Sequence, residues 1–276
     1  MKCPPFEYHR ATSVDDAVAA LVAADDEGKI LAGGQSLVPV LALRLARPAA
    51  LVDVNRVPGL DELAVRDGVL RAGALVRHAA LAGQTLHPLA AAAARYIGHA
   101  AIRSRGTVAG SLAHADPAAE LPAVLRACDG AVHVAGPDGS RRVSADTLFR
   151  GALQTDLGDH EVITAVELPR PDAWGFAEFA RRHGDFAVVS VAAARFGDRV
   201  RVVVGGVAGV PHLVTADAVD PGDVEGVAAA VADDVDPASD LHGSAAYRRA
   251  LTRELTRRAL GDLTGAASPA PVPEPA

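Results

Sequence analysis

The spacing of apolar residues near the start of the chain is typical of one helix between short strands. Apolar residues between 14 and 25 recur every three to four positions, which predicts an amphipathic helix packed on a sheet. Ser13, with Asp16 three residues later, is typical of a helix N-cap. The other predicted elements are strands at 29–33 and 50–57 and a helical turn or more at 36–45. Residues 1–57 are therefore expected to form a β-α-β-α-β unit.

Beyond residue 57 the pattern changes to period-two alternation. Asp67-Gly68 separates two alternating runs, and Pro137-Asp138-Gly139 lies in a second such region; both are typical of β-hairpins. Between them lies a polar, glycine-bearing segment, 98–122, which is expected to be a functional loop because long structured loops usually are. The other elements expected here are helices at about 75–82, 87–96 and 117–127 and a strand at 161–169.

A new pattern begins after Pro169 and Pro171, which stop strand pairing. Three apolar runs then predict a three-stranded antiparallel meander with a turn at Gly197-Asp198, covered by helices near 223–234 and 244–261. The proline- and alanine-rich end has nothing to bury and is expected to be disordered. The breaks in the pattern predict four divisions of the chain: 1–57, 58–170, 171–265 and a tail at 266–276.

Composition and charge narrow the possible functions. Half of the 276 residues are apolar, which is enough for a substantial core. The net charge of −7 argues against a nucleic-acid partner. Cys3 and Cys128 lie far apart without a C-x-x-C motif, so neither a disulfide framework nor a cysteine-ligated iron–sulfur cluster is expected. No apolar run is long enough to span a bilayer and no signal core is recognised at the start, so a cytoplasmic location is expected.

Two segments carry consecutive small residues, Ala32 to Ser36 and Gly106 to Ser111. Small side chains let a ligand approach the backbone, and inward-turned N–H groups form a concave site for phosphate oxygens. Two such loops predict a diphosphate held from both sides. The chain has neither G-x-G-x-x-G nor G-x-x-x-x-G-K-[ST], so a dinucleotide would be held in another way. The alternative, that these glycines only form turns, stays open.

Three segments together resemble a known family. Residues 32–39, 97–122 and 181–187 are similar, in order and spacing, to the FAD-binding medium subunit of molybdenum hydroxylases, the carbon monoxide dehydrogenase and xanthine dehydrogenase family. The resemblance implies an α+β fold: a two-subdomain FAD-binding domain of the PCMH type, followed by a C-terminal domain with a three-stranded antiparallel sheet and helices. It also implies partners, namely a large molybdenum-cofactor subunit and a small [2Fe–2S] subunit, assembled as a dimer of heterotrimers.

The resemblance also implies the cofactor contacts. Both small-residue loops would cradle the FAD diphosphate, and Asp116 would bond hydroxyls of the ribityl or ribose chain. Ile97 and Ile163 would pack near the adenine or the isoalloxazine, and Asp185 would close the flavin site. The complete set is Ala32, Gly33, Gly34, Gln35, Ser36, Leu37, Ile97, Thr107, Ala109, Gly110, Ser111, Asp116, Ile163 and Asp185.

The chain departs from the family pattern in two places. Ala109-Gly110-Ser111 stands where many relatives have Gly-Gly-Asn, and Ala177-Glu178 stands where some relatives carry a lysine beside the flavin. Both departures leave FAD binding in place, but the second leaves the redox tuning of the flavin open, since a cation there would stabilise the anionic reduced form.

Competing assignments find less support. His99, His114 and His183 lack the spacing of metal ligands, so no metal site is expected. Ser36 lacks the G-x-S-x-G context of a hydrolase nucleophile, and no catalytic residue is expected. Two functions stay open: a flavoprotein subunit that passes electrons from iron–sulfur clusters on a partner through FAD to an external acceptor, and a non-redox nucleotide or small-molecule binding module. A self-sufficient flavin oxidase is disfavoured because no base is recognised.

Overall fold

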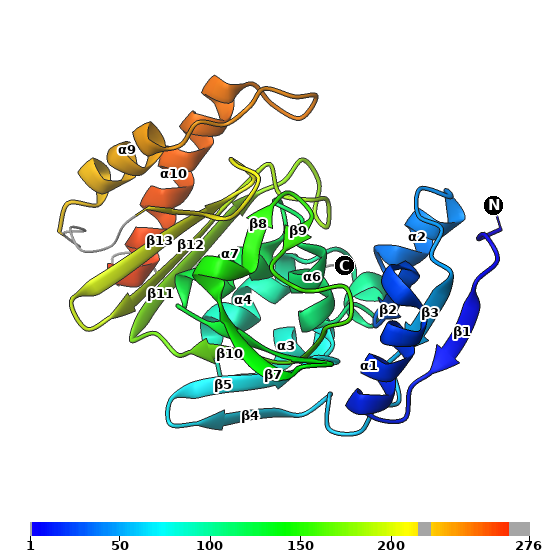
Figure 1. Cartoon of the computed structure of the whole chain (residues 1–276). Coiled ribbons are helices and arrows are strands. Elements are labelled where there is room, and N and C mark those ends of the chain that lie inside the picture. The colour runs from blue at the N-terminus through cyan, green and yellow to red at the C-terminus, as the bar shows by residue number, and fades with distance from the viewer. Residues whose placement is uncertain (1, 215–221, 265–276) are drawn as a thin grey trace.

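The computed structural model describes residues 2–214 and 222–264. Its three larger sheets lie within residues 7–53, 63–169 and 173–214. Figure 1 shows the first sheet at one side of the molecule and the third sheet, with its two covering helices, at the other. The mixed α+β fold is as predicted, whereas the tail predicted to be disordered lies outside the described residues. The domain boundaries stay a prediction.

The first sheet is parallel with strand order β1-β3-β2, as the β-α-β-α-β pattern predicts. Ser13 caps α1, because its side chain accepts a hydrogen bond of 3.0 Å from the Asp16 N–H. Leu21 of that helix is buried against the sheet. The elements are β1 (Glu7–Arg10), α1 (Val14–Ala23), a 3₁₀ turn (Asp25–Glu27), β2 (Gly28–Leu31), α2 (Leu37–Ala42) and β3 (Ala50–Asp53).

The second sheet is antiparallel with the order β4-β5-β10-β6-β7. Both predicted hairpins are confirmed, and Asp67 and Gly68 have φ of 50° and 76°, as a tight primed turn requires. The strands are β4 (Leu63–Arg66), β5 (Val69–Gly73), β6 (Ala131–Gly136), β7 (Gly139–Ser144) and β10 (Val162–Pro169), with a small hairpin of β8 (Phe149–Gly151) and β9 (Gln154–Thr155).

The segment 98–122, predicted to be a loop, is partly helical. It contains two short helices and the start of a third, and their few apolar positions are too short a run to show helical periodicity. Thr107 caps one of them by accepting a 3.1 Å hydrogen bond from Gly110. The helices of this part are α3 (His78–Gly83), α4 (Pro88–Tyr96), α5 (Ala100–Arg103), α6 (Val108–His114), α7 (Glu120–Ala127) and α8 (Ala145–Leu148).

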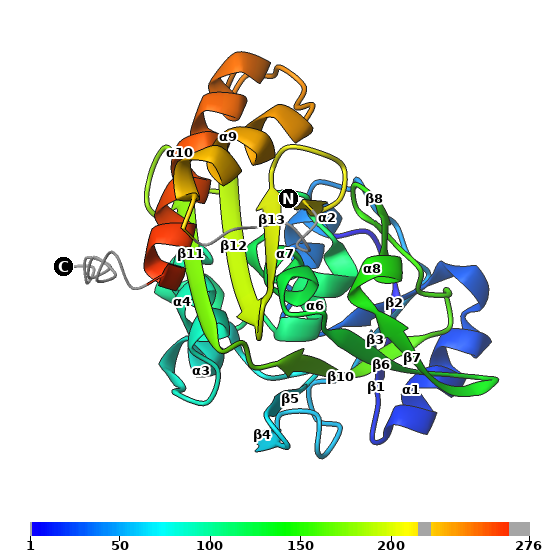
Figure 2. The same ribbon diagram turned by 90° about the vertical axis from the view of Figure 1, so that its left-hand side faces the viewer.

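The C-terminal sheet has four antiparallel strands, so the predicted number of three is wrong. The missed strand, β14, is only three residues long and follows Pro211, so it carries no alternating pattern. Helices α9 and α10 cover one face, and α4 and α7 pack on the other (Figure 2). The elements are β11 (Ala173–Phe179), β12 (Val189–Phe196), β13 (Arg199–Gly205), β14 (His212–Val214), α9 (Val224–Asp234) and α10 (Ala245–Thr264).

Candidate cofactor-binding site

A cleft of about 890 Å³ lies where the first two sheets meet the loop before β12. A cavity of this size is in the range of cofactor sites. Its walls include every residue that the sequence analysis proposed as a cofactor contact. The structure therefore brings together residues that are as much as 153 positions apart, from Ala32 to Asp185. Their roles as contacts stay a prediction.

The first small-residue loop presents free backbone donors to this cleft. Gly34 has φ +75°, a left-handed conformation that glycine adopts without strain. Within the described residues, the N–H groups of 33–37 donate no hydrogen bond. Successive free N–H groups around a left-handed residue form an anion-binding nest. The loop therefore has the backbone geometry of an anion-binding nest.

The prediction that both loops offer their backbone N–H groups to phosphate oxygens does not hold for the second loop. Val108 and Ala109 donate to the carbonyls of Val76 and Ala74, at 3.0 and 3.3 Å. Gly110 donates to the Thr107 hydroxyl. Most backbone donors of this loop are therefore used within the protein, and the loop adds the hydroxyl-bearing residues Thr107 and Ser111 to the cleft.

Glycines hold the two loops in direct contact. A Cβ at Gly33 would overlap the Arg105 carbonyl oxygen and would lie 2.8 Å from Gly106 Cα, so only glycine fits there. Asn55 and Arg77 join the same segments: the Asn55 side chain donates to the Ala32 carbonyl at 2.8 Å and accepts from Arg77 at 2.7 Å. Sequence reasoning missed both residues, because their partners are distant in the chain.

Apolar side chains cover other parts of the cleft. Ile97 and Ile163 are 9% and 6% exposed and make part of its wall apolar. Asp116 lies nearby, and its carboxylate accepts a 2.9 Å hydrogen bond from the Ala118 N–H. Asp185 and Phe186 are exposed at the cleft, on a loop of the C-terminal part of the chain.

Two buried polar residues of the cleft were not predicted. Burial lowers the pKa of His78 to about 4, so its ring is neutral; Nε2 is 2.8 Å from the Thr107 carbonyl and therefore carries the proton. Nδ1 then has no partner among the described residues. Burial, with a smaller contribution from the charge of Asp116, raises the pKa of Glu120 to about 7. Neither residue belongs to a recognisable local motif, so sequence reasoning could not single them out.

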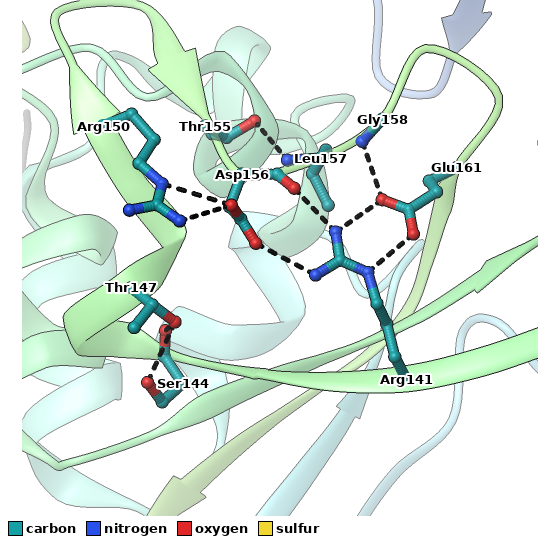
Figure 3. Close-up of polar contacts among 9 residues, drawn as sticks. All are labelled: Arg141, Ser144, Thr147, Arg150, Thr155, Asp156, Leu157, Gly158 and Glu161. Atoms are coloured by element: carbon teal, nitrogen blue, oxygen red, sulfur yellow. Dashed lines mark hydrogen bonds and ion pairs between the residues drawn. The ribbon is translucent and has the colours of Figure 1, made fainter.

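An arginine on β7 fixes the segment 156–161, which forms another part of the wall (Figure 3). Arg141 binds both carboxylate oxygens of Glu161, at 2.6 and 2.7 Å, and Asp156 Oδ2 at 2.9 Å. The Glu161 carboxylate also accepts from the Gly158 N–H at 2.7 Å. Hydrogen bonds from Arg141 lower the pKa of Glu161. The network holds the segment in one position beside Ile163.

The arrangement suits a diphosphate-bearing cofactor with a flat ring. It combines a backbone nest for anions, hydroxyl and carboxylate groups for sugar hydroxyls, and apolar walls. Among the described residues, the group with metal-binding geometry is Asp25, Asp26 and His160; it does not include His99, His114 or His183. The helices of the described chain include none that could span a membrane.

Comparisons with known proteins agree with this chemistry. Residues 4–171 match the family "FAD binding domain in molybdopterin dehydrogenase", and residues 174–263 match "CO dehydrogenase flavoprotein C-terminal domain". The chain is 42% identical to the nicotine 6-hydroxylase medium subunit of Paenarthrobacter nicotinovorans, over 94% of this chain and 98% of that one. It is 33% identical to the carbon monoxide dehydrogenase medium chain of Hydrogenophaga pseudoflava, over 93% and 96% of the two chains.

Solved structures show the same likeness. Carbon monoxide dehydrogenase from Hydrogenophaga pseudoflava superimposes with a TM-score of 0.90 at 31% identity, covering 97% of this chain and 100% of that chain. Quinoline 2-oxidoreductase from Pseudomonas putida 86 gives 0.88 at 34% identity, covering 96% and 99%. The chain therefore belongs to the family of FAD-binding medium subunits of molybdenum hydroxylase-type dehydrogenases.

Proposed function

We propose that this chain is the electron-transfer flavoprotein of a multi-subunit molybdenum hydroxylase. In this proposal it takes electrons from [2Fe–2S] clusters on a small partner chain and passes them through FAD to an external acceptor. The nest of free N–H groups at 33–37 is the observation that carries the proposal, because such a nest suits the oxygens of a diphosphate. FAD, when bound, supplies the redox chemistry.

The residues of the chain bind and orient the cofactor. The first loop would hold the diphosphate through its N–H groups, with hydroxyls of Thr107 and Ser111 beside it. Asp116 would accept hydrogen bonds from ribityl or ribose hydroxyls. Ile97 and Ile163, both buried, would exclude water from the ring systems.

The partners in this proposal are a large molybdenum-cofactor subunit and a small [2Fe–2S] subunit, as a dimer of heterotrimers in the cytoplasm. The cysteine content supports a need for partners, because Cys3 and Cys128 are the only two and an iron–sulfur cluster of the usual type takes four. The names of relatives, such as "6-hydroxypseudooxynicotine dehydrogenase complex subunit alpha", also support an assembly. Phe186, 65% exposed beside the cleft, lies where a partner could approach.

Purification from the native host tests this proposal. Tagged chain should recover a molybdenum-containing chain and an iron–sulfur chain, and the substrate of the complex should bleach the flavin in the complex but not in the isolated chain. Turnover of an organic substrate by the isolated chain would contradict the proposal. A colourless chain that stays colourless with added FAD would favour the non-redox binding module instead.

We expect the FAD to be bound without a covalent link, because the cleft offers hydrogen bonds and apolar contacts for the whole cofactor. Acid precipitation should release FAD into the supernatant, where its absorption and chromatographic mobility identify it. Flavin that stays in the pellet, or release of FMN alone, would show that this expectation is wrong.

Arg141→Gln should weaken FAD binding by about threefold to tenfold, because the segment 156–161 loses a bidentate partner. Titration of the apoprotein with FAD measures the effect. The matched control is Arg142→Gln: Arg142 follows on the same strand but pairs with Glu167, at 3.2 Å, and neither of these two residues lines the cleft. Equal affinities for the two variants would show that the segment needs no support from Arg141.

A further inference from the structure

Two glutamates lie in the region where α4 and α7 pack on the C-terminal sheet. Glu120 begins α7, is 5% exposed and lines the cofactor cleft. Glu178 lies on β11 two residues after Phe176, whose ring contacts Tyr96 of α4 with centroids 5.3 Å apart. Alternate residues of a strand share a face, so Glu178 lies on the face of the sheet that is turned toward α4 and α7.

Two buried polar atoms at and beside Glu178 lack partners among the described residues. Glu178 Oε2 is buried and has no hydrogen bond within the described chain. Ser190, which is paired with Glu178 across strands β11 and β12, is fully buried, and its hydroxyl has no partner in the same residues. Buried polar groups without partners are uncommon and call for an explanation.

The charged groups around the pair do not neutralise it. The negative charge of Asp116, which lines the cleft, raises the pKa of Glu120. The charge of Glu178 raises the pKa of Tyr96 on α4. The charge of Asp262 on α10 also raises the pKa of Tyr96. The buried cation of this interface, Arg201 of β13, donates to the Arg126 carbonyl at the other end of α7. In the described residues, neither glutamate has an ion pair within 4.0 Å.

Burial therefore decides the protonation of both groups. Burial, with a smaller contribution from the charge of Glu120, raises the pKa of Glu178 to about 9. Burial also raises the pKa of Glu120, to about 7. Because two neighbouring carboxylates oppose each other's ionisation, the pair binds one proton around pH 8 and two below about pH 6.

We propose that Glu120 and Glu178 form a proton-binding site in the wall of the cofactor cleft, which holds one proton at neutral to mildly alkaline pH and takes up a second when the flavin gains negative charge. This inference rests on the proposed function. Two electrons and one proton convert FAD to anionic FADH⁻; the pair takes one further proton from water, and the electrons come from the reductant. Glu120, which lines the cleft, is the group that gains it.

The sign of the pH dependence follows from the raised pKa of Glu120. At pH 8 its carboxyl is mostly ionised, so added negative charge in the cleft can raise its pKa and drive proton uptake. Below about pH 6 both carboxyls are already protonated, and the extra uptake disappears. At pH 8, where the reduced flavin is the FADH⁻ anion, reduction should thus consume about two protons per FAD, one bound by the flavin and one by the glutamate pair.

The slope of the flavin midpoint potential against pH measures this stoichiometry. In wild-type protein near pH 8 the slope should correspond to about two protons per two electrons, and in Glu120→Gln/Glu178→Gln to about one. The control is Asp262→Asn, which removes another partly buried carboxyl of this region and should keep the wild-type slope. Identical slopes for the wild type and the double variant would overturn the proposal.

A second measurement needs no flavin. At pH 8 the infrared spectrum of the apoprotein should show the C=O stretch of a protonated carboxylic acid, absent from Glu178→Gln and present in Asp262→Asn. If the chain bound no FAD, the proposed function would be wrong. The infrared band would still show the proton held by the glutamate pair. Absence of the band from the wild type at pH 8 would overturn the inference independently of the cofactor.

Discussion

Replacing Gly33 by alanine should give a colourless protein that is purified without FAD. The added Cβ would overlap the Arg105 carbonyl oxygen and approach Gly106 Cα to 2.8 Å. Both are backbone atoms, which cannot turn aside as a side chain can, so the two loops must separate. The nest would then lie at the wrong place for the diphosphate. We expect FAD affinity to fall at least about a hundredfold, corresponding to roughly 3 kcal/mol.

Binding is measured by titrating the apoprotein with FAD, and circular dichroism checks the fold. The matched control is Gly83→Ala, because a Cβ at Gly83 meets no atom within 4 Å; it should bind FAD like the wild type. A folded Gly33→Ala protein with normal flavin content would show that the contact between the loops is not needed for the cofactor.

Gly175→Val should strongly destabilise the C-terminal part of the chain. Gly175 lies on β11 where α10 crosses it, and any Cβ there would overlap the carbonyl group of Ala259. The helix must move off the sheet and expose Leu255 and Leu260, which are both 2% exposed. The expected loss is about 3 kcal/mol or more in the free energy of unfolding, or a melting temperature lower by about 10 °C.

Thermal unfolding followed by circular dichroism measures this loss. Gly261→Ala adds a methyl group to the same helix, α10, where the new Cβ would overlap no atom of the described segments that pack on the helix. Because alanine favours the helix over glycine, this control should be as stable as the wild type or slightly more stable. Equal melting temperatures for Gly175→Val and the wild type would mean that α10 does not pack as closely as the structure shows.

Elements with a strong local signal could be predicted from the sequence. Asp67-Gly68 determines its turn through left-handed backbone conformations, and Ser13 caps a helix through a contact three residues away. Segments without such a signal were missed: β14 is too short for a pattern, and the short helices between 98 and 122 have small, mixed faces.

The cleft could be predicted only where small residues cluster along the chain. The loop at 32–37 was found in this way, whereas the link between Asn55 and Arg77 depends on residues 22 positions apart. Likewise, nothing near Glu120 or Glu178 in the sequence shows that the fold brings both into the region where α4 and α7 pack on the C-terminal sheet, because they are 58 positions apart in the chain. Contacts between segments that are far apart in the chain could therefore not be predicted from the sequence pattern.

The packing of α7 on the C-terminal sheet has a consequence for engineering hybrid dehydrogenases. Phe176, Ala192 and Val203 belong to the same apolar core as Leu121 and Leu125 of α7. A chimera joined near residue 171, with its last part from another relative, would place two surfaces that did not evolve together across this core. Exchanging the complete medium chain, or grafting α7 with the sheet it covers, should therefore give soluble hybrids more often than exchange of the last part alone.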